Sequence, residues 1–357
     1  MSTRKISRRD FLKATITGAG LISLETLLDA CGQVAPLPSP AANTPVEDLE
    51  QATPTQPAPT PVSPTETALS PTDTVPAPTD TPAIPPDLVV TRGGEPEDLV
   101  RRAVAALGGM EKFVPPGSNV VIKPNICVAY RTYEYAATTN PWLVAALVKM
   151  AFEAGAASVK VMDLPFNGTQ KQAYIDSGVQ EQVEAVGGEM INTVSWKYVL
   201  MENPAAKFMK NASIYEDILN ADVLINVPIA KNHTSEARLT LGMKNLMGVV
   251  TQKDRNTMHY SLVKAIADLA ALVRPHLNVI DAVRILTANG PKGGRLADVQ
   301  KLDTVIASPD IVAADSYATT LFGMTSADIR YIGAATDLGV GRSDLENLRI
   351  QEIALNT

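Results

Sequence analysis

Hydrophobic residues between positions 87 and 357 occur as short apolar runs that alternate with longer stretches of helical periodicity. The apolar runs predict strands near 88–91, 119–123, 158–163, 190–192, 223–227, 278–281, 303–307 and 348–353. The periodic stretches predict helices near 95–107, 140–154, 261–273, 308–322 and 326–338. This alternation predicts an α/β fold, with a mostly parallel twisted sheet covered by helices on both faces, built as one core or as two lobes.

The stretch 221–250 carries the densest group of chemically active side chains. It begins with a strand predicted to be buried, 223–227, and is broken by Pro228. Lys231, Asn232 and His233 follow, and we expect the stretch to end in a helix that carries Lys244 and Asn245. Eleven residues separate His233 from Lys244, so a continuous helix would place both on a similar face. The next segment, 252–258, is polar and is predicted to be a loop, and Ser213 is predicted to cap a short helix.

The first 86 residues differ from the rest in composition. Residues 1–31 contain Ser-Arg-Arg-Asp-Phe-Leu-Lys, the pattern of a twin-arginine export signal, followed by an apolar stretch too short for a permanent membrane span. They end in Leu-Asp-Ala-Cys, which resembles a lipoprotein cleavage box and predicts lipidation of Cys31; an ordinary cleavage site elsewhere is the alternative. Residues 32–86 are rich in Pro and Thr and predict a disordered linker. The predicted location is the outer face of the cytoplasmic membrane, or the periplasm or exterior without the lipid.

Charge and cysteine content exclude some functions. The linker contains acidic residues but no Lys or Arg, which leaves residues 87–357 nearly balanced despite the overall net charge of −7. A balanced domain gives no electrostatic argument for nucleic-acid binding. The only cysteines are Cys31 and Cys127, so a four-cysteine iron–sulfur cluster cannot form within one chain.

Polar residues follow four of the predicted strands. Lys123 and Asn125 follow the strand at 119, and Asp163, Asn226 and Asp281 end three others. The carboxyl ends of parallel strands lie at one edge of a sheet, where such folds bind ligands. Each residue alone is better explained by capping, but together they predict a site.

The residue types suggest an anionic ligand, with a metal as an alternative. Lys231 and Lys244 would hold or polarise an oxyanion, and His233 would act as acid, base or ligand. Asp163, Asp281 and His259 could supply ligands to a divalent metal, although their spacing matches no compact metal motif. Lys292 and Gly293 belong to a glycine-rich loop, 289–294, which could bind an oxyanion through backbone N–H groups or be an ordinary turn. Cys127 is interpreted as a core residue rather than a nucleophile.

Taken together, these segments resemble a bacterial and archaeal family catalogued as domain of unknown function 362. The resemblance spans most of 88–323, and its most specific part is the pair Lys-Asn-His at 231–233 and Lys-Asn at 244–245. It implies a shared site around Lys123, Lys231, His233, Lys244 and Asn245. Some members carry iron–sulfur modules, which implies a redox partner, but this chain lacks the cysteines for such a module.

These observations lead to one main hypothesis and two alternatives. The main hypothesis is an exported, lipid-anchored α/β protein that binds an anionic small molecule or a metal at the carboxyl edge of its sheet, with enzymatic activity left open. The first alternative is a non-catalytic lipoprotein that binds solutes or partners. The second is an accessory protein of an iron–sulfur redox system.

Overall fold

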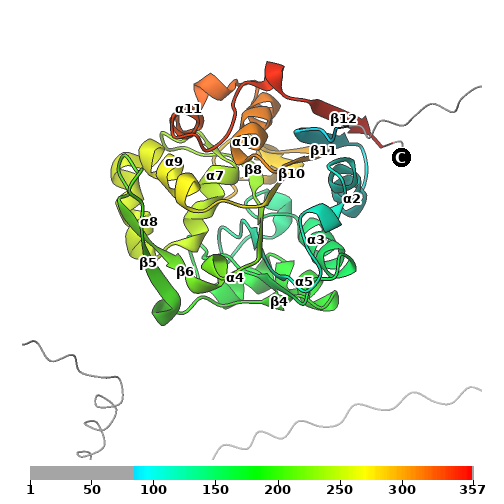
Figure 1. Ribbon diagram of the computed structural model, residues 1–357, viewed down its shortest axis with the longest axis horizontal. Coiled ribbons are helices and arrows are strands. Elements are labelled where there is room, and N and C mark those ends of the chain that lie inside the picture. The colour runs from blue at the N-terminus through cyan, green and yellow to red at the C-terminus, as the bar shows by residue number, and fades with distance from the viewer. Residues whose placement is uncertain (1–83, 356–357) are drawn as a thin grey trace, which may run out of the picture. The chain divides into compact units, whose positions relative to one another are not determined.

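A computed structural model describes residues 84–355 of the chain (Figure 1). The predicted export signal with Cys31 and nearly all of the predicted linker lie outside the described residues. The described residues belong to one compact unit rather than to two lobes. No helix among them has the length and apolar character needed to cross a bilayer.

The described residues form a ten-stranded sheet in which most neighbours are parallel. The order is β12-β1-β11-β10-β7-β2-β3-β4, with β8 and β9 attached beside β10. Parallel pairing joins β12 to β1 and runs without interruption from β10 through β4, whereas β11 pairs antiparallel with both of its neighbours. The strands are β1 (Leu88–Arg92), β2 (Asn119–Pro124), β3 (Ser158–Val161), β4 (Glu189–Met190), β7 (Val223–Val227), β8 (Ile229–Asn232), β9 (Leu239–Thr240), β10 (Leu277–Leu286), β11 (Val299–Ser308) and β12 (Ile350–Ala354).

Both faces of the sheet are buried because successive side chains of a strand point to opposite faces. Val120 and Ile122 of β2 pack into one apolar cluster, whereas Val121 between them packs into the other. Neighbouring strands repeat this alternation, which explains why the strands read as continuous apolar runs in the sequence.

Helices cover the two faces in two groups (Figure 1). The first cluster contains residues of α2 (Pro96–Ala106), α3 (Pro141–Glu153), α4 (Gln170–Asp176) and α5 (Val179–Ala185). The second contains residues of α7 (Gly242–Asn245), α9 (Leu262–Leu272), α10 (Ile311–Thr319) and α11 (Arg330–Asp337). The predicted α/β architecture with a mostly parallel sheet is therefore confirmed.

Three local predictions are wrong. The chain forms a hairpin of β8 and β9 between Pro228 and Lys244 instead of a helix from His233, because Lys231 and Asn232 pair with Thr240 and Leu239. The segment predicted as a polar loop is the helix α8 (Gln252–Met258). Ser213 caps no helix but lies within β6 (Asn211–Tyr215), which pairs with β5 (Tyr198–Glu202) as a separate two-stranded sheet; the short helix α6 (Glu216–Leu219) begins just after it.

Candidate functional site

A buried polar network lies at the carboxyl ends of β2, β3 and β7. The Nζ atom of Lys123 donates to Asp163 Oδ1 at 2.7 Å, to Asn245 Oδ1 at 3.0 Å and to the Pro124 carbonyl at 2.9 Å. An ammonium group has three N–H donors, so all donors of Lys123 are used. Burial lowers the pKa of Lys123, and the charge of Asp163 opposes that shift. Lys123 does not line the pocket described below.

Asn245 and Asn226 extend this network under α7. Asn245 Nδ2 donates to Asn226 Oδ1 and to the Lys123 carbonyl. Asn226 Nδ2 donates in turn to the Gly242 carbonyl and to Asn278 Oδ1. Because Asn226 is completely buried, it positions α7 and has no access to a ligand. Asn245, by contrast, lies at the pocket wall.

Asp315 of α10 anchors the start of α7 from the other side. Its two carboxylate oxygens accept the backbone N–H groups of Gly242 and Met243 at 2.6 and 3.0 Å. Burial raises the pKa of Asp315 to about 7, although these two amides favour its ionised form. The position of Lys244, two residues into this helix, therefore depends on a carboxyl group outside the pocket.

The hairpin of β8 and β9 places Lys231 directly across from Thr240. Lys231 Nζ donates to Asn125 Oδ1 and to the Ala137 carbonyl, both at 2.7 Å, so its third N–H has no oxygen acceptor among the described residues and has the Cys127 side chain as its neighbour. Burial lowers the pKa of Lys231, partly offset by Cys127 and Asp163. Thr240 is 4% exposed, and its hydroxyl has no hydrogen-bond partner within the described part of the chain.

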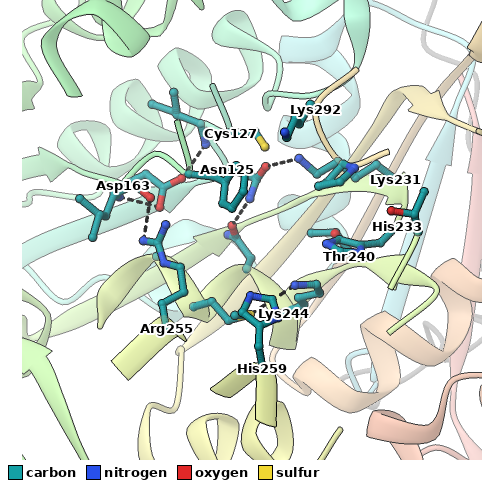
Figure 2. A pocket seen from close by; sticks show the side chains of 18 residues that line it. Asn125, Cys127, Asp163, Lys231, His233, Thr240, Lys244, Arg255, His259 and Lys292 are labelled. Carbon is teal, nitrogen blue, oxygen red and sulfur yellow. Dashed lines mark hydrogen bonds between the residues drawn. The ribbon is translucent and has the colours of Figure 1, made fainter. Parts of the chain in front are cut away.

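A pocket of about 310 Å³ lies between this hairpin, α7, α8 and the loops that follow β2 and β3 (Figure 2). Cationic and imidazole side chains dominate its polar lining, with Asp163 as its one carboxylate among the described residues. The polar side chains that line it are Asn125, Asp163, Lys231, His233, Thr234, Thr240, Lys244, Asn245, Arg255, His259 and Lys292. This volume suits a small molecule, and the balance of charge favours an anion.

Lys244 differs from the other buried lysines of the site. Its Nζ atom has one hydrogen-bond partner among the described residues, the thioether sulfur of Met247 at 3.3 Å. Burial, reinforced by the charge of Lys231, lowers the pKa of Lys244 to about 8. A thioether is a weak acceptor, so an ammonium at this position lacks a proper counterpart.

His233 is held as a neutral imidazole. Burial, together with the charges of Lys244 and Lys231, lowers its pKa to about 3. Its Nδ1 atom accepts the backbone N–H of Ser235 at 3.0 Å, which assigns the ring proton to Nε2. A neutral ring of this tautomer is a hydrogen-bond donor at Nε2, which suits an oxyanion better than it suits proton abstraction.

Arg255 on α8 is a pocket residue that the sequence analysis missed. Its guanidinium donates to the carbonyls of Leu164 and Pro165, which fixes the loop after β3. Its Nε–H is buried with no partner within the described residues. The only sequence signal is that Arg255 and Met258 share one face of a short helix at i, i+3, and this signal is invisible when the segment is read as a loop.

The glycine-rich loop approaches β8 very closely. Gly290 N donates to Asn232 Oδ1 at 3.2 Å, and a side chain at Gly290 would overlap the Asn232 carbonyl. This contact places the exposed Lys292 at the pocket edge, where its Nζ atom lies 5.2 Å from the ring centroid of Phe166. Gly293 is buried and has a φ of 75°, but it does not line the pocket.

The three predicted metal ligands do not come together. Asp163 is occupied by Lys123 and by the amides of Ile126 and Leu164, whereas Asp281 lies outside the pocket and accepts the amides of Asn140 and Val283. His259 is exposed at the pocket edge. Across residues 84–355, no group of three His, Cys, Asp or Glu side chains is placed to hold a metal ion. The structure therefore does not bring the three predicted metal ligands together, and both carboxylates accept backbone amides.

Fold and site together define an α/β protein with a cationic pocket at the carboxyl edge of its sheet. The family model "Domain of unknown function (DUF362)" matches residues 120–320, more than half of the chain, and the chain belongs to this family.

Known proteins similar to this chain include a thylakoid-associated protein of Synechocystis sp., which is 27% identical over 254 residues, covering 69% of this chain and 76% of that protein. Among solved structures, the lactate racemase apoprotein of Thermoanaerobacterium thermosaccharolyticum matches with a TM-score of 0.38 and 13% identity, over 70% of this chain and 59% of that one. A protein of Thermotoga maritima matches with a TM-score of 0.40 and 12% identity, over 64% and 60%.

Proposed function

We propose that the pocket binds a small organic anion, a carboxylate in the first instance. The observation that carries this proposal is the buried ammonium of Lys244, whose one partner among the described residues is a thioether. A buried cation without a counter-charge is costly, so an anionic ligand that supplies an oxygen acceptor gains a charge-assisted hydrogen bond.

The surrounding groups fit the same ligand. Among the described residues, Lys231 has one N–H without an oxygen acceptor and Arg255 has a buried Nε–H without a partner. His233 has a donor at Nε2. These donors come from the β8–β9 hairpin and from α8, while the neighbouring carboxylate, Asp163, has its charge compensated by Lys123 at 2.7 Å. An oxyanion in this position meets donors and no uncompensated negative charge.

The test is calorimetric titration of the protein with oxalate, a small dicarboxylate without a reactive ketone. We expect binding that weakens about tenfold to a hundredfold in Lys244→Met, the effect of losing one charge-assisted hydrogen bond of about 1.5–3 kcal/mol. The matched control is Lys264→Met, because Lys264 is an exposed lysine of α9 outside the pocket. Equal affinities in the two variants, or no binding of oxalate and acetate to the unsubstituted protein, would contradict the proposal.

We further propose that the protein acts outside the cytoplasm, tethered by a lipid on Cys31. The twin-arginine pattern, the cleavage box and the Pro/Thr-rich segment after it support this proposal. The name of the Synechocystis relative, which is described as thylakoid-associated, agrees with a membrane location. Metabolic labelling with a fatty acid should mark the protein and should fail to mark Cys31→Ser; labelling of that variant, or none of either, would refute the tether.

A further inference from the structure

We propose that Lys244 is an imine-forming lysine and that the ligand class of the pocket is a small 2-oxo acid, whose ketone reacts with the Nζ atom of Lys244. This inference rests on the proposed anion binding and adds to it a covalent step. The carboxylate of a 2-oxo acid supplies the negative charge that the pocket favours, and the adjacent ketone supplies the electrophile.

The first support is the surroundings of the Lys244 amine. It lines the pocket, belongs to a residue that is 7% exposed, and has a thioether as its partner among the described residues. An amine must be neutral to attack a carbonyl, and burial beside a second cation favours the neutral form. The lowered pKa of Lys244, about 8, agrees with this geometry.

The second support is the division of labour between the two pocket lysines. Lys231 is fixed by two hydrogen bonds of 2.7 Å, and its third N–H has no oxygen acceptor within residues 84–355, so it can donate to a carboxylate without moving. Both lysines line the same pocket, and the charge of Lys231 contributes to the lowered pKa of Lys244. In this proposal the carboxylate of the ligand contacts Lys231 and the adjacent ketone meets Lys244.

The third support is an unpartnered hydroxyl in the same pocket. Thr240 is more than nine-tenths buried, lines the pocket opposite Lys231, and its Oγ1 atom has no partner within residues 84–355. A hydroxyl can both accept and donate a proton, so it can relay one between the nitrogen and oxygen of a tetrahedral intermediate. The Nε2–H of His233 can stabilise that oxygen as a donor.

The chemistry is balanced without an added oxidant or reductant. The lone pair of the neutral amine forms the new C–N bond, and the carbonyl π electrons move to oxygen. A proton passes from nitrogen to that oxygen, giving a carbinolamine. Its hydroxyl then accepts a second proton, relayed through the Thr240 hydroxyl, and the C–O bond breaks so that oxygen leaves as water. The nitrogen lone pair completes the C=N bond, and the remaining proton on nitrogen returns through the same hydroxyl to replace the one that was supplied. One ketone and one amine thus yield one imine and one water.

The test is reductive trapping on the full-length protein with pyruvate and cyanoborohydride, followed by mass spectrometry of the intact chain and of its peptides. We expect one adduct per chain, located on Lys244, and at least about tenfold less adduct in Lys244→Arg, whose guanidinium is not nucleophilic at neutral pH. Lys264→Met should label like the unsubstituted protein. Oxalate should suppress labelling by occupying the pocket.

The outcomes separate the two proposals. If oxalate and pyruvate bind but pyruvate is not trapped, or is trapped equally in Lys244→Arg, the imine is refuted and the anion pocket stands. If neither molecule binds and no adduct forms, both proposals fail. If labelling is spread over many surface lysines and oxalate does not suppress it, the reaction is unspecific and the imine is refuted.

Discussion

Lys123 and Lys244 are both buried lysines of one site, but the groups around their amines differ. Lys123 donates to a carboxylate, an amide oxygen and a carbonyl, which uses every N–H of its ammonium. Lys244, the residue before Asn245 on α7, donates to a sulfur atom. Buried cations stabilise a fold only when they are paired, so the first lysine is part of the structure and the second is available to a ligand. Two lysines at one sheet edge therefore have different roles, one structural and one in ligand binding, because their hydrogen-bond partners differ.

The largest change in stability should come from replacing Lys123, whose ammonium uses all three N–H groups. Lys123→Met leaves the carboxylate of Asp163 buried without its cation, and we expect the free energy of unfolding to fall by about 3–5 kcal/mol. Urea unfolding measures this change. Lys123→Met combined with Asp163→Asn should be more stable than Lys123→Met alone, because no uncompensated charge remains. A Lys123→Met protein as stable as the original would show that the network is not structural.

A smaller effect should follow from crowding the same ion pair. Gly248 packs against it so closely that an added methyl group would overlap Asp163 Oδ1 and lie 2.6 Å from Lys123 Nζ. We expect Gly248→Ala to cost about 1–3 kcal/mol in unfolding experiments, as overpacking does. Gly333→Ala in α11 is the control, since nothing lies within 4 Å of the added methyl, and it should stabilise the protein by about 0.5–1 kcal/mol. Similar values for both variants would contradict the predicted crowding.

The carboxyl group behind α7 should produce a pH dependence. Burial raises the pKa of Asp315 to about 7, so the folded state holds this proton more tightly than the unfolded chain does. Its contribution to stability is then complete below about pH 4, the ordinary aspartate value, and is lost as the pH rises through about 7. The difference in unfolding free energy between the unsubstituted protein and Asp315→Asn should therefore shrink from pH 4 to pH 8. Burial also raises the pKa of Asp281, but Asp281 is present in both proteins and cancels in the difference. A difference that does not depend on pH would therefore show that Asp315 does not titrate in this range.

The smallest change in stability should come from replacing Lys244, whose one partner among the described residues is a thioether. At pH 7 we expect Lys244→Met to alter the unfolding free energy by no more than about 0.5 kcal/mol, or to raise it, since no oxygen acceptor loses its donor. Burial lowers the pKa of Lys244 to about 8, below the unfolded value of about 10.4, so the stability that its neutral amine contributes is complete above pH 10.4 and is lost as the pH falls through 8. Unfolding experiments between pH 8 and pH 10 should show the unsubstituted protein gaining stability relative to Lys244→Met. A large loss at pH 7 would make Lys244 a structural residue like Lys123.

The sequence predicted the sheet and the edge at which the site lies. The strands that lead to the site are short apolar runs that end in polar residues, and this pattern can be recognised without knowing any tertiary contact. It could not separate Lys123 from Lys244, since both are lysines near strand ends and only tertiary contacts with Asp163 and Asn245 distinguish them. Arg255 escaped notice for a related reason. Its helix buries a guanidinium in place of an apolar side chain, so the segment shows no apolar periodicity. Asp281 was predicted to be a metal ligand, but its carboxylate accepts backbone amides. The sequence alone does not distinguish these two roles.

The polar network joins residues that are far apart in the sequence, and this determines the stage of folding at which the pocket forms. Lys123 bonds Asn245 across 122 positions of the chain, and Lys231 bonds Asn125 across 106. Contacts between such distant residues form late, because the intervening chain must first be ordered. In refolding experiments, the capacity to bind oxalate should therefore return only in the last kinetic phase, after helical circular dichroism has recovered. Oxalate binding would then report completed folding, because partially folded species would not bind oxalate.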